Sequence, residues 1–104
     1  MKIAIASVGK NENSEISSRG GRAPYYLIFD GNGKLLEAIS NPFAVGGGGA
    51  GTAVAKMLSD MSINVVIAGA IGEKMATSLN EKDIQYYEKE GNIKDVLDYF
   101  LKNK

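Results

Sequence analysis

Residues 25–40 read YYLIFDGNGKLLEAIS, and this stretch decides the class of fold. Residues 25–30 are mostly aromatic and aliphatic, which favours a β-strand. Asp30-Gly31-Asn32-Gly33 is a typical tight-turn sequence, because these residue types tolerate positive φ or support turns through their side chains. Residues 34–40 then return as a second strand, which Pro42 limits because proline has no N–H to donate. An antiparallel hairpin is therefore predicted.

Apolar segments on both sides extend this hairpin into an α/β protein. Residues 2–8 (KIAIASV) and 63–68 (INVVIA) are almost continuously apolar, as strands buried on both faces are. Residues 84–87 (IQYY) predict a short fifth strand, and Asn92 is a good N-cap for a final helix. Three apolar stripes at helical spacing predict helices: Ala50, Ala53, Val54, Met57, Leu58 and Met61; Met75, Ala76 and Leu79; Ile93, Val96, Leu97, Phe100 and Leu101.

The resulting order is βββαβαβα within one domain, because 104 residues leave no room for two. Right-handed crossovers place helices on both faces of the sheet. With the strands numbered in chain order, the predicted arrangement is 3-2-1-4-5, with the second strand antiparallel to the others. This is the ribonuclease H-like arrangement, a three-layer α/β domain with a mixed five-stranded sheet.

Composition excludes several classes of function. Twelve basic and twelve acidic residues balance, which argues against a general nucleic-acid or membrane-surface binder. Cysteine and histidine are both absent, so disulfides, thiolate chemistry and the commonest metal ligand and general base are excluded. The lack of disulfides favours the cytoplasm. No stretch approaches the roughly 18 apolar residues of a membrane span.

The predicted topology brings several loops to one edge of the sheet. Segments 7–22, 46–51 and 69–73 meet there, at the edge where ligands of open α/β sheets bind. Glycines let the GGGGAG loop point N–H groups at an anion, and the following helix adds its positive end. Arg19 and Arg22 face this loop and suit anionic oxygens. The predicted ligand-binding residues are Ser7, Arg19, Gly21, Arg22, Gly47, Gly48, Gly49, Gly51, Gly69 and Gly72.

Plainer interpretations of the same residues stay open. A glycine run is also a flexible connector, and no Lys-Ser/Thr pair follows it as a phosphate-binding P-loop requires. Arg19 and Arg22 also fit an ordinary solvated surface. Met57, Met61 and Met75 fit gap-filling in the core better than metal ligation.

Two strings resemble a known family. Gly21–Asp30 (GRAPYYLIFD) is similar to a signature of the dinitrogenase iron–molybdenum cofactor (NifX/NifB C-terminal) family, and Val65–Gly72 (VVIAGAIG) falls in the family's order. The resemblance covers essentially the whole chain. It implies the ribonuclease H-like fold and a role in binding, carrying or inserting iron–sulfur precursors of the nitrogenase cofactor. A protein partner in cofactor assembly is expected on the same basis.

The sequence departs from that family at two places. Members usually carry His-Phe where this chain has Arg19 and Gly20, and many carry a cysteine where it has Ala50 and Thr52. Iron in clusters prefers thiolate or imidazole ligands. The resemblance therefore implies an iron–sulfur or iron–molybdenum cluster held without Cys or His, by arginines and backbone N–H groups. Phosphate or another oxyanion satisfies the same geometry.

Three functions follow, from different classes. A non-catalytic binding or carrier domain is favoured. A regulatory or partner-binding module that has lost its cluster is the alternative, since Cys and His are missing. A ribonuclease H-fold hydrolase is disfavoured, because two-metal catalysis needs carboxylates. Residues 2–8 contain no Asp or Glu, and Asp30 and Glu73 are the only carboxylates expected near the strand ends.

Overall fold

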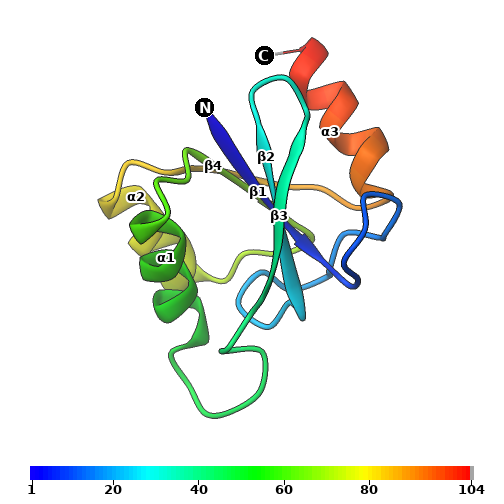
Figure 1. The fold of residues 1–104 in the computed structure, drawn as a ribbon. Helices are drawn as coiled ribbons and strands as arrows, with labels where there is room; N and C mark the ends of the chain where they lie inside the picture. The colour runs from blue at the N-terminus through cyan, green and yellow to red at the C-terminus, as the bar shows by residue number, and fades with distance from the viewer. Residues whose placement is uncertain (104) are drawn as a thin grey trace.

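The computed structural model describes residues 1–103 and contains the five strands and three helices expected (Figure 1). Every predicted strand is present, with its ends within two residues of the prediction. The elements are β1 (Lys2–Ser7), β2 (Tyr25–Asp30), β3 (Leu35–Ser40), α1 (Ala50–Asp60), β4 (Val65–Ala68), α2 (Glu73–Glu81), β5 (Gln85–Glu88) and α3 (Ile93–Lys102).

The strand order is β3-β2-β1-β4-β5, which confirms the predicted 3-2-1-4-5 arrangement. β2 is antiparallel to both β1 and β3, whereas β1 pairs with β4, and β4 with β5, in parallel. The hairpin turn is fastened by Asp30, whose Oδ1 accepts the N–H groups of Asn32 (2.8 Å) and Lys34 (3.0 Å). These two hydrogen bonds lower the pKa of Asp30, because they stabilise the ionised carboxylate.

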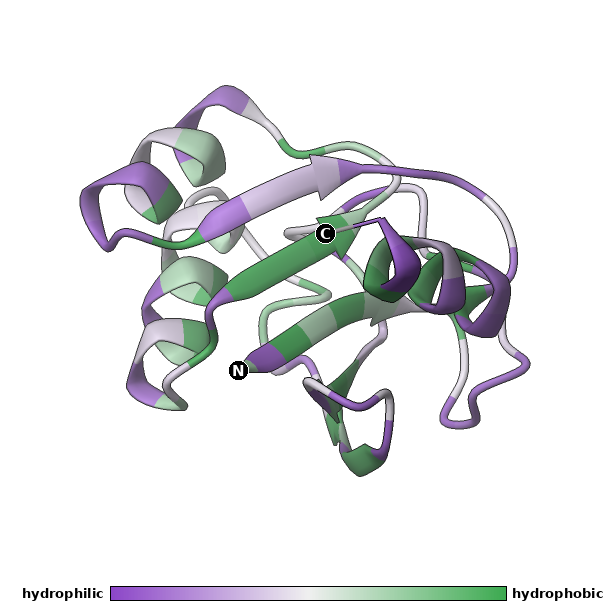
Figure 2. Cartoon of the chain, turned by 90° about the horizontal axis from the view of Figure 1, so that it is seen from above, coloured by the Kyte–Doolittle hydropathy of each residue, from purple (hydrophilic) through white to green (hydrophobic). Residues whose placement is uncertain are grey.

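Helices cover both faces of the sheet, as predicted, and each face has its own apolar layer (Figures 1 and 2). On one face α1 and α2 pack over the sheet through Val54, Leu58, Met75 and Leu79, against Ala4, Tyr26, Ile28 and Val66. On the other face α3 packs alone, through Ile93 and Leu97, against Ile3, Ile5, Leu27, Phe29, Val65 and Ile67.

The two faces are therefore covered unequally. A helix is about 10 Å across and strands lie about 4.8 Å apart, so one helix covers about two strands of five. Figure 2 shows α3 beside β1 and β4, with β5 beyond it. Gln85 and Tyr87 of β5 are exposed on that side. No helix within residues 1–103 is long and apolar enough to cross a bilayer.

The long segment between β1 and β2, predicted as an irregular loop, packs closely onto the sheet. Ser17 donates its N–H to the carbonyl of Ala6 (2.9 Å) and accepts the N–H of Gly69 (2.9 Å) at its own carbonyl. It thereby joins the carboxyl ends of β1 and β4. Ile16 and Ala23 are buried. Much of the predicted ligand edge is thus filled by the chain itself.

Candidate functional site

The loops predicted to meet at the carboxyl edge of the sheet do meet there. Gly21 lies against the backbone of Gly51 at the start of α1, and Gly69 lies against Ser17 and Ser18. The N–H of Gly20 donates to the carbonyl of Ala70 (2.9 Å). Segments far apart in the sequence are therefore in contact, and the glycines among them fall into two groups.

The first group is closely packed, and we call it the closed glycine joint (Gly20, Gly21, Gly51 and Gly69). A Cβ atom on Gly20 or Gly21 would have its nearest neighbour at 3.1 Å, which is tight, and the other two have no space for a Cβ. A Cβ atom on Gly51 would lie 2.7 Å from Met75 Cβ, and one on Gly69 would lie 2.7 Å from Ser18 Cα. Real Cβ contacts are essentially never this short. In this structure these glycines let the chain approach itself. Ligand contact by Gly21, Gly51 and Gly69 stays a prediction.

The second group stands in open space, and we call residues 42–49 the open loop. A Cβ atom on any of Gly46, Gly47, Gly48 or Gly49 would meet nothing within 4 Å. In Figure 1 the loop extends beyond the sheet, between the end of β3 and the start of α1. Gly72, before α2, is open in the same way.

The open loop and the start of α1 present a run of unused donors. Within residues 1–103, no backbone N–H from Val45 to Thr52 donates a hydrogen bond to a protein acceptor, and the next N–H, of Ala53, donates to Gly49. A helix leaves four such groups by itself. Here the loop adds four more, so eight consecutive N–H groups within the described residues donate to no protein acceptor.

The electrostatics of the two nearby helices differ. α1 begins at Gly49, whose φ of 85° is left-handed, with no side-chain cap and no acidic residue in its first turn. α2 also lacks a side-chain cap but carries Glu73 in its first turn. A helix amino end attracts anions, and a carboxylate in the first turn competes with them. The start of α1 is therefore better suited to an external anion.

Arg22 fastens the base of the open loop. Its guanidinium donates Nη1–H to the carbonyl of Phe43 (3.1 Å) and Nη2–H to the carbonyl of Gly47. Asn41 supports the same joint by donating Nδ2–H to the carbonyls of Gly21 (3.1 Å) and Ala23 (2.9 Å). Arg22 thus shapes the loop and keeps a positive charge beside a hollow of about 290 Å³.

The other two predicted polar groups have different surroundings. The hydroxyl of Ser7 is buried and engaged locally, donating to the carbonyl of Gly9 (2.6 Å) and accepting its N–H (3.1 Å). Arg19 is exposed, and within the described residues its side chain forms no hydrogen bond or ion pair. Arg19 therefore has an uncommitted guanidinium, whereas Ser7 has a structural partner.

Direct coordination of a metal has little support here. Residues 1–103 contain no group of three or more His, Cys, Asp or Glu side chains that could hold a metal ion. The whole chain lacks Cys and His. Backbone N–H groups and guanidinium groups contact the periphery of an anion rather than a metal centre. This donor set fits a negatively charged cluster carried as cargo, or a simpler oxyanion.

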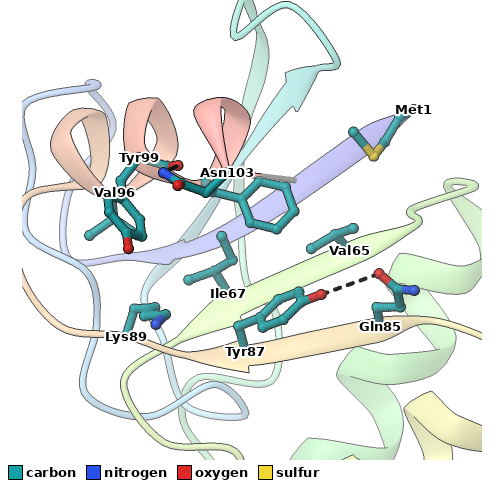
Figure 3. A pocket seen from close by; sticks show the side chains of 10 residues that line it. Met1, Val65, Ile67, Gln85, Tyr87, Lys89, Val96, Tyr99 and Asn103 are labelled. Atoms are coloured by element: carbon teal, nitrogen blue, oxygen red, sulfur yellow. Dashed lines mark hydrogen bonds between the residues drawn. The ribbon is translucent and has the colours of Figure 1, made fainter.

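The sequence reasoning did not find a second hollow on the opposite face of the sheet. It lies between α3 and the strands β4 and β5, with a volume of about 380 Å³ (Figure 3). Gln85, Tyr87 and Lys89 line it together. Their spacing of two residues was the available signal, because alternate residues of a strand share a face.

Comparison with known proteins places the chain in a family. The profile of the family described as dinitrogenase iron-molybdenum cofactor matches residues 1–103. This protein belongs to that family. The GRAP string that suggested it is the segment around Arg22 that fastens the open loop. The family resemblance predicted from the sequence is thus confirmed.

Relatives of this family member include a protein of Methanocaldococcus jannaschii described as uncharacterized MJ0580. It is 29% identical over 108 residues, covering 100% of this chain and 88% of the relative. The NMR structure of a Thermotoga protein, TM1290, described as a candidate NifB protein, superposes with a TM-score of 0.82 and 29% identity. That match covers 98% of this chain and 88% of the other.

Two further solved structures support the fold alone. The apo form of the orange protein from Desulfovibrio gigas matches with a TM-score of 0.90 and 24% identity, covering 97% of this chain and 87% of that one. PH0822 matches with a TM-score of 0.85 and 23% identity, covering 100% and 93%. The topology is therefore shared by proteins of low sequence identity.

Proposed function

We propose that this protein is a non-catalytic binding or carrier domain that holds an anionic metal cluster, or a small oxyanion, at the open loop and the start of α1. The observation that carries the proposal is the run of eight unused backbone N–H groups from Val45 to Thr52. Membership of the dinitrogenase iron–molybdenum cofactor family supports a cofactor-type cargo. We keep the ribonuclease H-like assignment of the architecture as a prediction.

The proposed contacts are outer-sphere. Backbone N–H groups of Gly47, Gly48 and Gly49 surround the anion, and the amino end of α1 adds its partial positive charge. Arg22 holds the loop in place through the carbonyls of Phe43 and Gly47. Because that guanidinium is partly committed, we assign Arg19 the more mobile role of contacting the anion from outside.

The first test is gel filtration under anaerobic conditions with an iron–sulfur cofactor precursor, with metal and protein read in the same peak. We expect co-elution with the wild type and its loss in Arg19→Ala/Arg22→Ala. The matched control is Lys56→Ala/Lys94→Ala, which removes the same charge from exposed positions on α1 and α3. Unchanged co-elution in the arginine variant would contradict the proposed site.

A second test separates a small oxyanion from a cluster. Inorganic phosphate is titrated into isotope-labelled protein at constant ionic strength, and amide shifts are followed by NMR. We expect the largest shifts at residues 45–52. Equal shifts at the start of α2, where Glu73 competes, would show that helix ends in general, rather than the open loop, attract the anion.

The alternative function is a partner-binding module in cofactor assembly that has lost cluster binding. One observation favours it: Val45, in the open loop, is 91% exposed, which is high for an aliphatic side chain. Phe43 is only partly buried below it. Absence of both cluster and phosphate binding, with a partner lost on Val45→Asp, would favour this function.

A further inference from the structure

The hollow beside α3 is a feature that the open loop does not account for. It has a volume of about 380 Å³, within the range of about 300–1,000 Å³ typical of small-molecule pockets. It lies on the face of the sheet opposite α1 and α2. A ligand there neither requires nor excludes an anion at the open loop.

The hollow exists because one helix cannot cover the sheet. Val65 and Ile67 of β4 form its floor, with Val96 of α3 on one side (Figure 3). Phe100 of α3 also lines it. Tyr87 of β5 lines the hollow from the strand side, and the centroid of its ring lies 5.5 Å from that of Phe100, with the two rings tilted by 58°. The two rings therefore contact each other, and together they present an aromatic surface at the side of the hollow on which a further aromatic ring can pack.

The polar groups are arranged at the two ends of the hollow. Because β4 and β5 are parallel, Val65 and Gln85 mark one end. Lys89 follows β5 and marks the other, about 13 Å along the strand at 3.3 Å per residue. Lys89 is exposed, and its N–H donates to the carbonyl of Ala68 (2.9 Å), which fixes its backbone.

Lys89 is the one charged side chain among the residues that line the hollow within the described part of the chain. Among residues 1–103, no carboxylate lines the hollow to neutralise this charge. The ammonium of Lys89 lies at one end, and Met1 with its amino group lines the end marked by Val65 and Gln85. Apolar walls with positive charge and no acidic lining residue within 1–103 are complementary to an amphipathic anion. The aromatic side chains Tyr87, Tyr99 and Phe100 favour an aromatic body over an aliphatic one.

We propose that the hollow between α3 and β5 binds a small aromatic monoanion, whose ring packs beside the Tyr87–Phe100 pair and whose acidic group contacts Lys89. The probes are anilinonaphthalene sulfonate and phenyl naphthylamine, which share an aromatic body and differ in the acidic group. Fluorescence titration of the purified full chain measures both affinities. We expect one site per chain, with amide shifts centred on Ile67 and Tyr87.

Charge reversal at Lys89 tests the electrostatic part. Lys89→Glu should lower the affinity for anilinonaphthalene sulfonate at least about fivefold, because this probe carries a negative charge. The affinity for the uncharged phenyl naphthylamine should change by less than about twofold. The matched control is Lys94→Glu, the same change at an exposed position of α3 outside the hollow. Equal weakening by Lys94→Glu, or no weakening by Lys89→Glu, would overturn the assignment.

Filling the hollow tests the apolar part. Val96→Phe should lower the affinity for both probes at least about fivefold. A thermal melt of the variant shows whether it is folded. If this variant does not fold, the Lys89→Glu comparison still decides. Sedimentation supplies the remaining outcome: a wild-type dimer that Tyr99→Arg converts to monomer would show that a second copy covers this face, and would overturn the small-ligand assignment.

Discussion

Two sets of glycines lie near the same edge of this sheet and do opposite things. The closed glycine joint allows protein backbone and side chains to approach within distances that no Cβ could tolerate, as at Gly51 and Gly69. A Cβ atom on any glycine of the open loop would meet nothing within 4 Å, and the N–H groups of these glycines donate to no acceptor within the described residues. The difference shows that glycine content alone does not separate a packing joint from a binding loop.

The largest expected effect comes from adding a methyl group to the closed joint. Gly69→Ala places a Cβ 2.7 Å from Ser18 Cα and 2.9 Å from Ser17 O. Because backbone must move to relieve this, we expect the free energy of unfolding to fall by about 3 kcal/mol. Urea denaturation measures it. A loss below about 1 kcal/mol would mean that the joint is looser than the contacts indicate.

Tyr26 supports the closed joint through its hydroxyl, which is buried and donates to the carbonyl of Gly20 (2.6 Å). Tyr26→Phe leaves that carbonyl without this donor, and we expect a loss of about 1–3 kcal/mol. Denaturant unfolding followed by circular dichroism tests this. A loss as large as that of Gly69→Ala would show that the hydroxyl, rather than steric fit, dominates the joint.

Burial also raises the pKa of Tyr26, so its phenol ionises later in the folded than in the unfolded state. Above a pH of about 10 the unfolded chain loses this proton first, and stability falls as the pH rises. Wild-type stability should therefore decline more steeply between pH 9 and about 11 than that of Tyr26→Phe. Parallel slopes would contradict the role of this phenol.

Arg22 links the closed joint to the open loop, because it follows Gly21 in the chain and binds carbonyls of Phe43 and Gly47. Arg22→Ala should cost only about 1 kcal/mol, since its partners are accessible to water. The loop should become more mobile, measured as lower NMR order parameters for residues 43–48. Arg22→Lys, with one donor group in place of a planar fork, should restore the order only partly.

The smallest expected effect is in the open loop itself. Gly48 does not have a positive φ, and a Cβ there meets nothing within 4 Å. Gly48→Ala should therefore change the free energy of unfolding by less than about 0.5 kcal/mol. Thermal denaturation of Gly48→Ala and Gly69→Ala, each compared with the wild type, measures the difference between the two positions. Similar losses in the two variants would remove the distinction between joint and loop.

Sequence patterns were sufficient for the fold. The turn at Asp30–Gly33 fixed the antiparallel pair, and the apolar runs in β1 and β4 marked buried parallel strands, so strand order followed from chain connectivity. The same sequence patterns were less informative for the candidate ligand-binding site. The predicted loops meet at the carboxyl edge of the sheet, but nothing in the sequence distinguishes Gly51, packed on Met75, from Gly48, which is open.

The sequence by itself determined the elements, their order and the absence of Cys and His ligands, because these depend on local periodicity, turn chemistry and composition. The family followed from the resemblance of two strings, Gly21–Asp30 and Val65–Gly72, to known members. Only the tertiary structure decided which donors remain available. Arg22 is committed to the loop and Ser7 to Gly9, whereas the N–H groups from Val45 to Thr52 are unused. The hollow by Lys89 likewise depends on how far α3 reaches across the sheet. The unused donors and the hollow both depend on distances between segments that are remote in the sequence. A local sequence pattern does not specify such distances.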